Sequence, residues 1–453
     1  MGVSKLPAPR VPLSSRGYID RMDAGLTAVK GAQEIIAMIS SRRFVTRLVL
    51  GHNELADDGC VVLFKFLTSS VGRKYQIAEI SLNSNCIGDR GLAAISDYLQ
   101  GNQVLKVLFL QDNKFTGDAQ TLTSFVTALN ASRLELLSFT SNRNLSNPFV
   151  EVFLPSLDSP YLREIHLSAI GLTSLAAPHL ISYISSPRCR LHTLKCSGNS
   201  LGFRAVKAII RAIERHNFSL LIVEIYANHA VGPVSSDNTS GDDDDEDGVE
   251  GPASLDAWKA SEAHIRRVLL RNTHLKRETE KEALQLLRYA RPLLLTSSGH
   301  APSTRCTDCS CAHPPGPRSG PADSDGAAAP AARGFAFRAL PTELQLHIMS
   351  FLAPTLSPAQ RIRIYTFASS PATLPRAGLC LPDRAGIGSM CVLDPSSMPF
   401  GMASGGCAGG KCAGATNSVV CHKEQQRAEW LSAVGCAAYD PLREGDTGAD
   451  PVQ

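Results

Sequence analysis

The chain has 453 residues, of which 43% are hydrophobic and 19% charged, and its formal net charge is +3. That length holds two or three structural units, and that hydrophobic fraction is enough for a packed core. The small net charge gives no case for nucleic-acid binding, and no apolar run reaches the length of a membrane span. The first residues also lack a secretory apolar core, so we expect a cytoplasmic or nuclear protein with reduced cysteines.

The first two segments precede any recurring motif. Residues 1–17 contain three prolines and no apolar periodicity, which predicts a flexible leader. Residues 25–39 have apolar positions at helical spacing without a strand before them. We expect this helix to cap the hydrophobic end of the array that follows.

One motif occurs seven times between residues 48 and 228, at steps of 28 to 32 residues. Its first copy is Leu48-Val-Leu-Gly-His-Asn-Glu-Leu55, in which two inward apolar residues of a strand precede an asparagine. The asparagine can satisfy backbone groups of the turn that leaves the strand, so its role is structural. The asparagine position is occupied by Asn53, Asn85, Asn113, Asn142, Ile170, Asn199 and Asn228. Because Ile170 cannot make these bonds, we expect a looser or differently closed turn in its unit.

A helical pattern follows each strand, for example at residues 59–67 and 91–99. One strand and one helix per unit predict an α/β solenoid at residues 18–232, with parallel strands on the concave side and helices on the convex side. The pattern resembles the leucine-rich repeat family over residues 24–232. The length of the repeat is similar to that of the ribonuclease-inhibitor-like subclass.

The outward strand positions and their neighbours mix charges, one aromatic residue and two histidines. Such a mixture suits protein recognition better than a small-molecule pocket, although a solvated face without a partner remains the alternative. Two histidines in adjacent units seldom form a metal site, so we treat them as surface residues. The partner-binding residues predicted on the concave face are Arg47, Val49, Glu79, Lys106, Phe109, Arg163, His166, His192, Lys195 and Glu224.

The repeats are followed by an acidic segment and a helical one. Residues 233–253 contain the run Gly241-Asp-Asp-Asp-Asp-Glu-Asp247, which predicts a disordered acidic loop. Residues 254–292 return to helical spacing and predict two helices, one capped by Ser254 and one over residues 277–289 that ends before Pro292. We expect this pair to close the last repeat.

Residues 293–334 are rich in Ser, Pro, Gly and Ala and predict a linker. Within it, Cys306-Thr-Asp-Cys309-Ser-Cys311-Ala-His313 has ligand types suited to zinc. A structural zinc site needs a second ligand pair across a folded hairpin, and none follows, so no metal site is assigned.

Residues 335–375 predict two short helices, the first with a strongly apolar face. The first helix resembles the opening of the F-box, whose helices dock on the Skp-type linker of a cullin ubiquitin ligase. The later cysteine or arginine followed by tryptophan is missing, and the alternative is a helical pair that packs on its own chain. The residues that carry the resemblance, and so the predicted linker contact, are Leu340, Pro341, Glu343, Leu344, Ile348, Phe351 and Leu352.

Residues 376–453 are rich in Cys and Gly and predict a mostly disordered tail with one short helix near residues 424–434. Residues 405–412 nearly match a phosphate-binding loop. The match fails because Cys412 replaces the Ser or Thr that binds magnesium and no apolar strand precedes the loop.

No catalytic constellation or complete cofactor loop occurs, so the chain is predicted to be a binding protein, not an enzyme, without cofactor or metal. The first hypothesis is a substrate-recognition subunit of a cullin ubiquitin ligase, which holds a protein substrate on the concave face. The second is a leucine-rich repeat scaffold without a ubiquitin role. A third follows from the resemblance of repeats with an acidic stretch to the Ran GTPase-activating protein. We expect a monomer that binds neither nucleic acid nor membrane.

Overall fold

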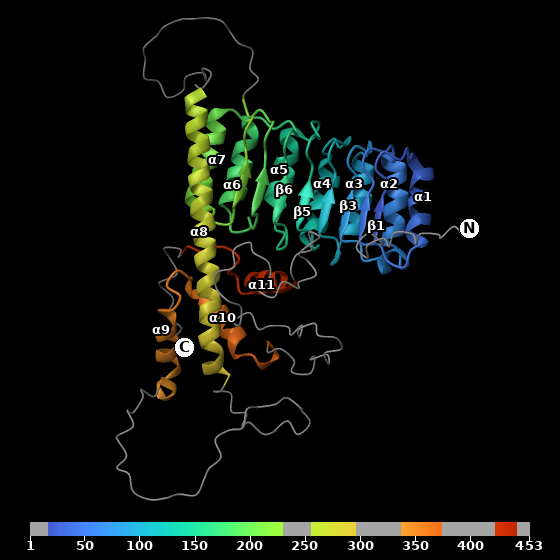
Figure 1. The fold of residues 1–453 in the computed structure, drawn as a ribbon. Coiled ribbons are helices and arrows are strands. Elements are labelled where there is room, and N and C mark those ends of the chain that lie inside the picture. The colour runs from blue at the N-terminus through green and yellow to red at the C-terminus, as the bar shows by residue number, and fades with distance from the viewer. Residues whose placement is uncertain (1–16, 230–254, 296–336, 374–421, 442–453) are drawn as a thin grey trace, which may run out of the picture. The chain divides into compact units, whose positions relative to one another are not determined.

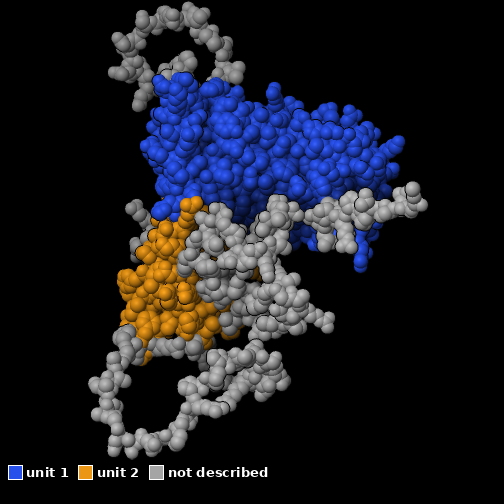
Figure 2. Space-filling view, viewed as in Figure 1, with its two compact units in different colours: residues 1–274 blue, residues 275–453 orange. Residues whose placement is uncertain are grey.

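The computed structural model describes residues 17–229, 255–295, 337–373 and 422–441 (Figure 1). The predicted acidic run, the cysteine cluster at residues 306–313 and the glycine-rich loop at residues 405–412 lie outside these residues. The chain divides into two compact units, residues 1–274 and 275–453, which Figure 2 distinguishes by colour.

The first unit is built on one parallel sheet of eight strands in sequence order. Each of the first seven strands is followed by a helix, and these helices lie along one side of the sheet (Figure 1). This arrangement confirms the predicted α/β solenoid. The strands are β1 (Tyr18–Asp20), β2 (Arg47–Val49), β3 (Glu79–Ser81), β4 (Val107–Phe109), β5 (Leu136–Ser138), β6 (Glu164–His166), β7 (Thr193–Lys195) and β8 (Ile222–Glu224). The helices are α1 (Ala28–Ser40), α2 (Ala56–Thr68), α3 (Asp89–Leu99), α4 (Ala119–Asn130), α5 (Ser146–Ser156), α6 (Ala177–Ser185) and α7 (Phe203–His216), with short 3-10 turns η2 (Gly72–Lys74) and η3 (Ser174–Ala176).

The core lies between the sheet and these helices. The middle residue of most strands points into it, and Leu48, Ile80 and Leu108 are fully buried. Phe139 directly follows β5, and its side chain lies in the middle of the core. Its ring packs against that of Phe149, with the two ring centroids 5.3 Å apart. Burying a side chain of this size stabilises the fold by about 1.5–3 kcal/mol, so the rows of apolar residues hold the array together.

The repeat asparagines connect adjacent coils, as their position in the motif predicts. Asn199 Nδ2 donates to the carbonyl of Cys196 in its own coil at 3.0 Å and to that of Leu167 in the preceding coil at 2.9 Å. Its Oδ1 accepts the amides of Ile170 and Leu172 at 3.0 and 3.1 Å. The unit that lacks its own asparagine is therefore closed by the asparagine of the next coil.

The prediction of seven strand-bearing units was wrong, because the helix at residues 25–39 has a strand of its own. That strand is β1, which pairs with β2 in parallel. Its coil was missed because Ala24 occupies the asparagine position and Arg21 the preceding apolar position. The amides of Ala24 and Leu26 still bind Asn53 Oδ1, at 3.1 and 3.0 Å.

The residue before each asparagine position has a left-handed backbone. Ser141 has a φ of 65°, Ala169 of 53° and Gly198 of 69°. Only glycine adopts this region without cost, yet just one coil of the array has glycine here. The sharp turn after the strand is thus imposed by the bonds between coils.

Helix α8 (Leu255–Leu294) is a single helix, so the prediction of two helices was wrong. No glycine or proline interrupts residues 270–276, and Pro292 falls in the last turn, where the helix ends anyway. Ser254, the predicted cap, lies outside the described residues.

The first part of α8 covers the last repeat, as predicted for this segment. Ile265 and Val268 join the core of the repeats. Asn272 Nδ2 donates to the carbonyl of Asn217 at 3.1 Å. In an interior coil the equivalent carbonyl, that of Asn102, accepts an amide of the next coil at 2.9 Å. Asn272 therefore takes the place of that amide at the last coil of the described residues.

The second unit contains the rest of α8 with η5 (Phe337–Ala339), α9 (Thr342–Ser350), α10 (Pro358–Ser369), η6 (Pro371–Thr373) and α11 (His422–Ala433). The helix predicted near residues 424–434 is confirmed as α11. It packs into the core of this unit through Trp430 and Leu431, together with Leu287 of α8 and Ile364 of α10. No helix of the described residues is long and apolar enough to cross a membrane.

Removing the Asn199 side chain should destabilise the array by about 2–4 kcal/mol, because buried carbonyls and amides of two coils lose their partners. Asn199→Ala and the exposed control Asn144→Ala are compared by urea unfolding followed by circular dichroism. The control should change the free energy of unfolding by less than about 0.5 kcal/mol. Equal effects of the two substitutions would contradict the role of the asparagine.

Gly198→Ala should cost about 1 kcal/mol of unfolding free energy, because alanine is strained at positive φ. The added Cβ would lie 3.7 Å from Ala169 Cβ, so steric conflict does not contribute. The matched change Ala169→Gly relieves the same strain and should be neutral or stabilising, whereas Ala94→Gly within α3 should cost up to about 1 kcal/mol. Urea unfolding measures the effect of all three substitutions. If Ala169→Gly destabilised the protein as much as Ala94→Gly, strain at this positive φ would be contradicted.

Candidate functional site

The first and third residues of each strand form the sheet face, which is the side of the sheet opposite the helices. They lie there because the middle residue of each three-residue strand faces the core, buried in β1 to β7 and partly buried at Val223 of β8. The register is maintained across the sheet, so equivalent residues of adjacent coils lie side by side. The third positions are Asp20, Val49, Ser81, Phe109, Ser138, His166, Lys195 and Glu224.

Burial varies along these positions. Val49 and His166, both predicted to contact a partner, are only 6% and 9% exposed. Neighbouring strands lie about 4.8 Å apart, so longer side chains on either side cover the shorter ones. Phe109, Lys195 and Glu224 are half-buried and present part of their surface.

Opposite charges in adjacent coils pair across the sheet face. Arg47 on β2 binds Glu79 on β3 at 2.6 Å, and Lys195 on β7 binds Glu224 on β8 at 3.1 Å. Each pair keeps contact with solvent and is worth about 0–1 kcal/mol, so its main effect is to neutralise this part of the face.

Lys106 forms a similar pair with Glu135, at 2.5 Å, just before β4 and β5. Lys106 was predicted from the sequence, whereas Glu135 was not. The signal was present, because Glu135 occupies the position of Lys106 one coil later.

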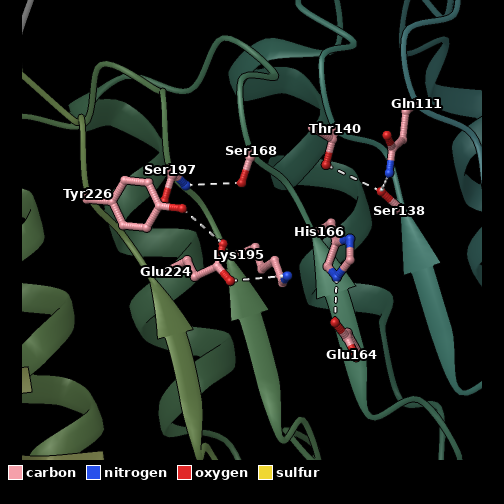
Figure 3. Close-up of polar contacts among 10 residues, drawn as sticks. All are labelled: Gln111, Ser138, Thr140, Glu164, His166, Ser168, Lys195, Ser197, Glu224 and Tyr226. Atoms are coloured by element: carbon pink, nitrogen blue, oxygen red, sulfur yellow. Dashed lines mark hydrogen bonds and ion pairs between the residues drawn. The ribbon is translucent and has the colours of Figure 1, made fainter. Parts of the chain in front are cut away.

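Several separate polar contacts lie over the sheet face from β5 to β8 (Figure 3). His166 Nε2 lies 2.6 Å from Glu164 Oε1, and the Tyr226 hydroxyl donates to Glu224 at 3.3 Å. The amide of Ser197 donates to the Ser168 hydroxyl at 3.2 Å. His166 and Glu224 were predicted from the sequence, whereas Glu164, Ser168, Ser197 and Tyr226 were not.

The residues of these contacts that were not predicted share a simple relation to the predicted ones. Ser168, Ser197 and Tyr226 each stand two residues after the third position of a strand, and Glu164 stands two residues before one. Continuing the alternation of side chains on both sides of the selected positions would have included them.

Arg163 and His192 occupy equivalent positions just before β6 and β7. Their coils are joined directly, since the His192 amide donates to the Arg163 carbonyl at 2.7 Å. Burial lowers the pKa of the Arg163 guanidinium, and the nearby charge of Arg190 lowers it further. Among the described residues, no group of three or more His, Cys, Asp or Glu side chains is arranged to hold a metal ion.

The F-box-like residues lie on and around α9 in the second unit. Pro341 is the residue before the helix, and Glu343 lies in its first turn. Leu344, Ile348 and Phe351 are 48%, 42% and 70% exposed. The remaining residues of the motif, Leu340 and Leu352, are half-buried.

The opposite side of α9 packs inward through Met349, which is 2% exposed. This helix therefore belongs to the core of its own unit while its apolar motif residues face outward. Helix α10 begins with a capping box, in which Ser357 and Gln360 bond each other's backbone, as the predicted second helix requires.

Comparisons with known proteins agree with the repeat architecture. A family model described as "Leucine Rich repeat" matches residues 43–64 and 79–96. The chain is 25% identical over 228 residues to a Mus musculus protein named "Ribonuclease inhibitor". That match covers 44% of this chain and 49% of the mouse protein, so the chain spans about half the length of this relative. The chain thus contains leucine-rich repeats similar to those of ribonuclease inhibitor, an architecture that serves protein–protein interaction.

The cysteines of the repeats should differ strongly in reactivity. Cys189 and Cys196 are buried, and burial raises the pKa of the Cys189 thiol to about 11 and that of Cys196 to about 12. Both stay protonated at pH 8, and their reactive thiolate forms only as the pH approaches those values. The half-buried Cys86 should react first with iodoacetamide at pH 8.

Peptide mapping by mass spectrometry after timed labelling measures each site separately. Unfolding in urea is the control, since it should make all three thiols react at similar rates. Native labelling of Cys196 as fast as that of Cys86 would contradict the burial of this thiol.

Proposed function

We propose that the protein is a substrate-recognition subunit of a cullin ubiquitin ligase, whose α9 contacts the Skp-type linker. The observation that carries the proposal is the exposed apolar stripe of Leu344, Ile348 and Phe351 on one side of α9. Exposed apolar side chains at helical spacing are the usual anchors when a helix docks in a groove.

The second unit supplies a rigid base for this stripe. Gln360 of α10 is fully buried, and its side chain donates to the carbonyl of Gly435 at 2.8 Å. Glu282 of α8 accepts the amide of Thr355 at 2.9 Å, between α9 and α10. These bonds support a fixed orientation of α9, which lowers the entropy cost of docking.

The contacts of α8 and α10 also bear on the second half of the F-box motif, which this sequence lacks. Helix α11 and the end of α8 complete the core around α9 and α10, in a chain that lacks the later segment of the F-box motif. We infer that these two helices substitute for that segment and leave the outer side of α9 available.

The solenoid is the element that we propose to hold the protein substrate. The partner-binding residues predicted on its concave side lie on the sheet face or just before the strands, and the half-buried ones offer contact area. Mixed charges there favour selection of a partner by charge pattern.

The Ile348→Asp, Phe351→Asp double variant should lose capture of the purified Skp-type linker in a pull-down with the full chain. Carboxylates at these positions would be desolvated in an apolar groove, which should weaken binding at least about tenfold. Leu175→Asp is the matched control, since this apolar side chain of η3 is 70% exposed, as Phe351 is. The control should capture the linker like the unchanged chain.

Circular dichroism and a melting curve confirm that each variant is folded before the comparison. Failure of the folded, unchanged chain to capture the linker would refute the ubiquitin-ligase role. The protein would then be a leucine-rich repeat scaffold.

A further inference from the structure

A group of basic side chains lies beside the sheet face, where the chain enters β5, β6 and β7. We call Arg133, Tyr161, Arg163, Arg188 and Arg190 the arginine rim. Arg133, Tyr161 and Arg190 each stand three residues before the first residue of their strand. The parallel register therefore brings them to consecutive coils of one edge, and all three are exposed.

The members of the rim lie close to one another. The Arg133 guanidinium carbon lies 5.1 Å from the centroid of the Tyr161 ring, at stacking distance. Arg163 lies near enough to Arg190 for the second charge to lower the pKa of the first. Arg188 Nη1 donates to the carbonyl of Pro155 at 2.5 Å, which fixes its position without neutralising it.

The rim differs in charge from the sheet face. On the sheet face Arg47, Lys106 and Lys195 each bind a carboxylate. Among the described residues, no ion pair joins Arg133 or Arg190 to a carboxylate.

Two of the three carboxylates closest in sequence to the rim also pair with a basic group outside the rim. Glu135 binds Lys106 and also acts on Arg163, whose pKa its charge raises, and Glu164 lies against His166. Asp158 is exposed and lies near enough to influence the Tyr183 hydroxyl. Positive charge therefore exceeds negative charge along this edge.

We propose that the arginine rim binds an acidic segment of a protein partner, with Asp or Glu carboxylates on the guanidinium groups. Guanidinium groups bind carboxylates through two parallel hydrogen bonds, and the Tyr161 ring offers an apolar surface between two of them. This inference rests on the proposed role of the solenoid as the protein-binding element. It is independent of the linker contact of α9.

An acidic protein segment fits the rim better than a nucleic acid does. Glu135, Asp158 and Glu164 lie among the basic residues and would repel a continuous line of phosphates. A peptide can space its carboxylates to avoid them. Tyr161 is also a single ring, whereas single-stranded nucleic acids are bound by several stacked aromatic residues.

The test measures binding of a fluorescein-labelled Glu-Glu-Ala repeat peptide to the full chain by fluorescence anisotropy, with the Gln-Gln-Ala peptide as the ligand control. Arg133→Glu with Arg190→Glu should weaken binding at least about tenfold, and binding should fall as sodium chloride is raised. Arg211→Glu with Arg267→Glu changes the net charge equally at exposed arginines of α7 and α8 and should weaken binding less than about threefold.

Three results would overturn the proposal. One is equal loss of affinity in the rim and control variants, and another is tighter binding of a labelled single-stranded RNA than of the acidic peptide. The third is peptide binding that appears only after residues 242–247 of the chain itself are changed to Asn and Gln, since these residues would then be the occupant. Linker capture by the rim variant is measured in parallel, so failure here is distinguishable from failure of the ubiquitin-ligase proposal.

Discussion

The hydrogen bonds between coils are the constraint on which the rest of the first unit depends. Three-residue strands cannot be stable alone, so each coil needs the next one to satisfy its backbone. The asparagine side chains extend this pairing beyond the strands into the turns, where Asn199 serves two coils at once. The bonds also impose the left-handed residue before each asparagine, which explains why Ala169 holds a conformation that suits glycine.

A fixed register turns the sequence period into a surface pattern. A residue in one coil has its counterpart beside it in the next coil. Lys106 and Glu135 occupy equivalent positions in adjacent coils, and they form an ion pair because their charges are opposite. The same rule creates the row of Arg133, Tyr161 and Arg190, where the counterparts do not neutralise each other. The residue type at a single position of the repeat therefore decides whether charged side chains in adjacent coils form ion pairs or stay without them.

Much of the fold could be predicted from the sequence because the motif has a strong period, whereas features that break the period could not. The first coil was not predicted because Ala24 stands where most coils have asparagine. Burial of Val49 and His166 depends on the length of neighbouring side chains, which periodicity does not report. The packing of α11 on α8 and α10 joins segments far apart in sequence, and no local pattern indicates it.

Binding at the sheet face and binding at the arginine rim would differ in cost. A partner that uses Arg47 or Lys195 must first separate them from Glu79 or Glu224, so much of the new contact replaces an old one. Arg190 has no such carboxylate among the described residues, and its charge already acts unfavourably on Arg163. A carboxylate placed there would relieve a repulsion as well as form a bond. For an acidic partner the rim therefore offers more binding free energy per contact than the sheet face beside it.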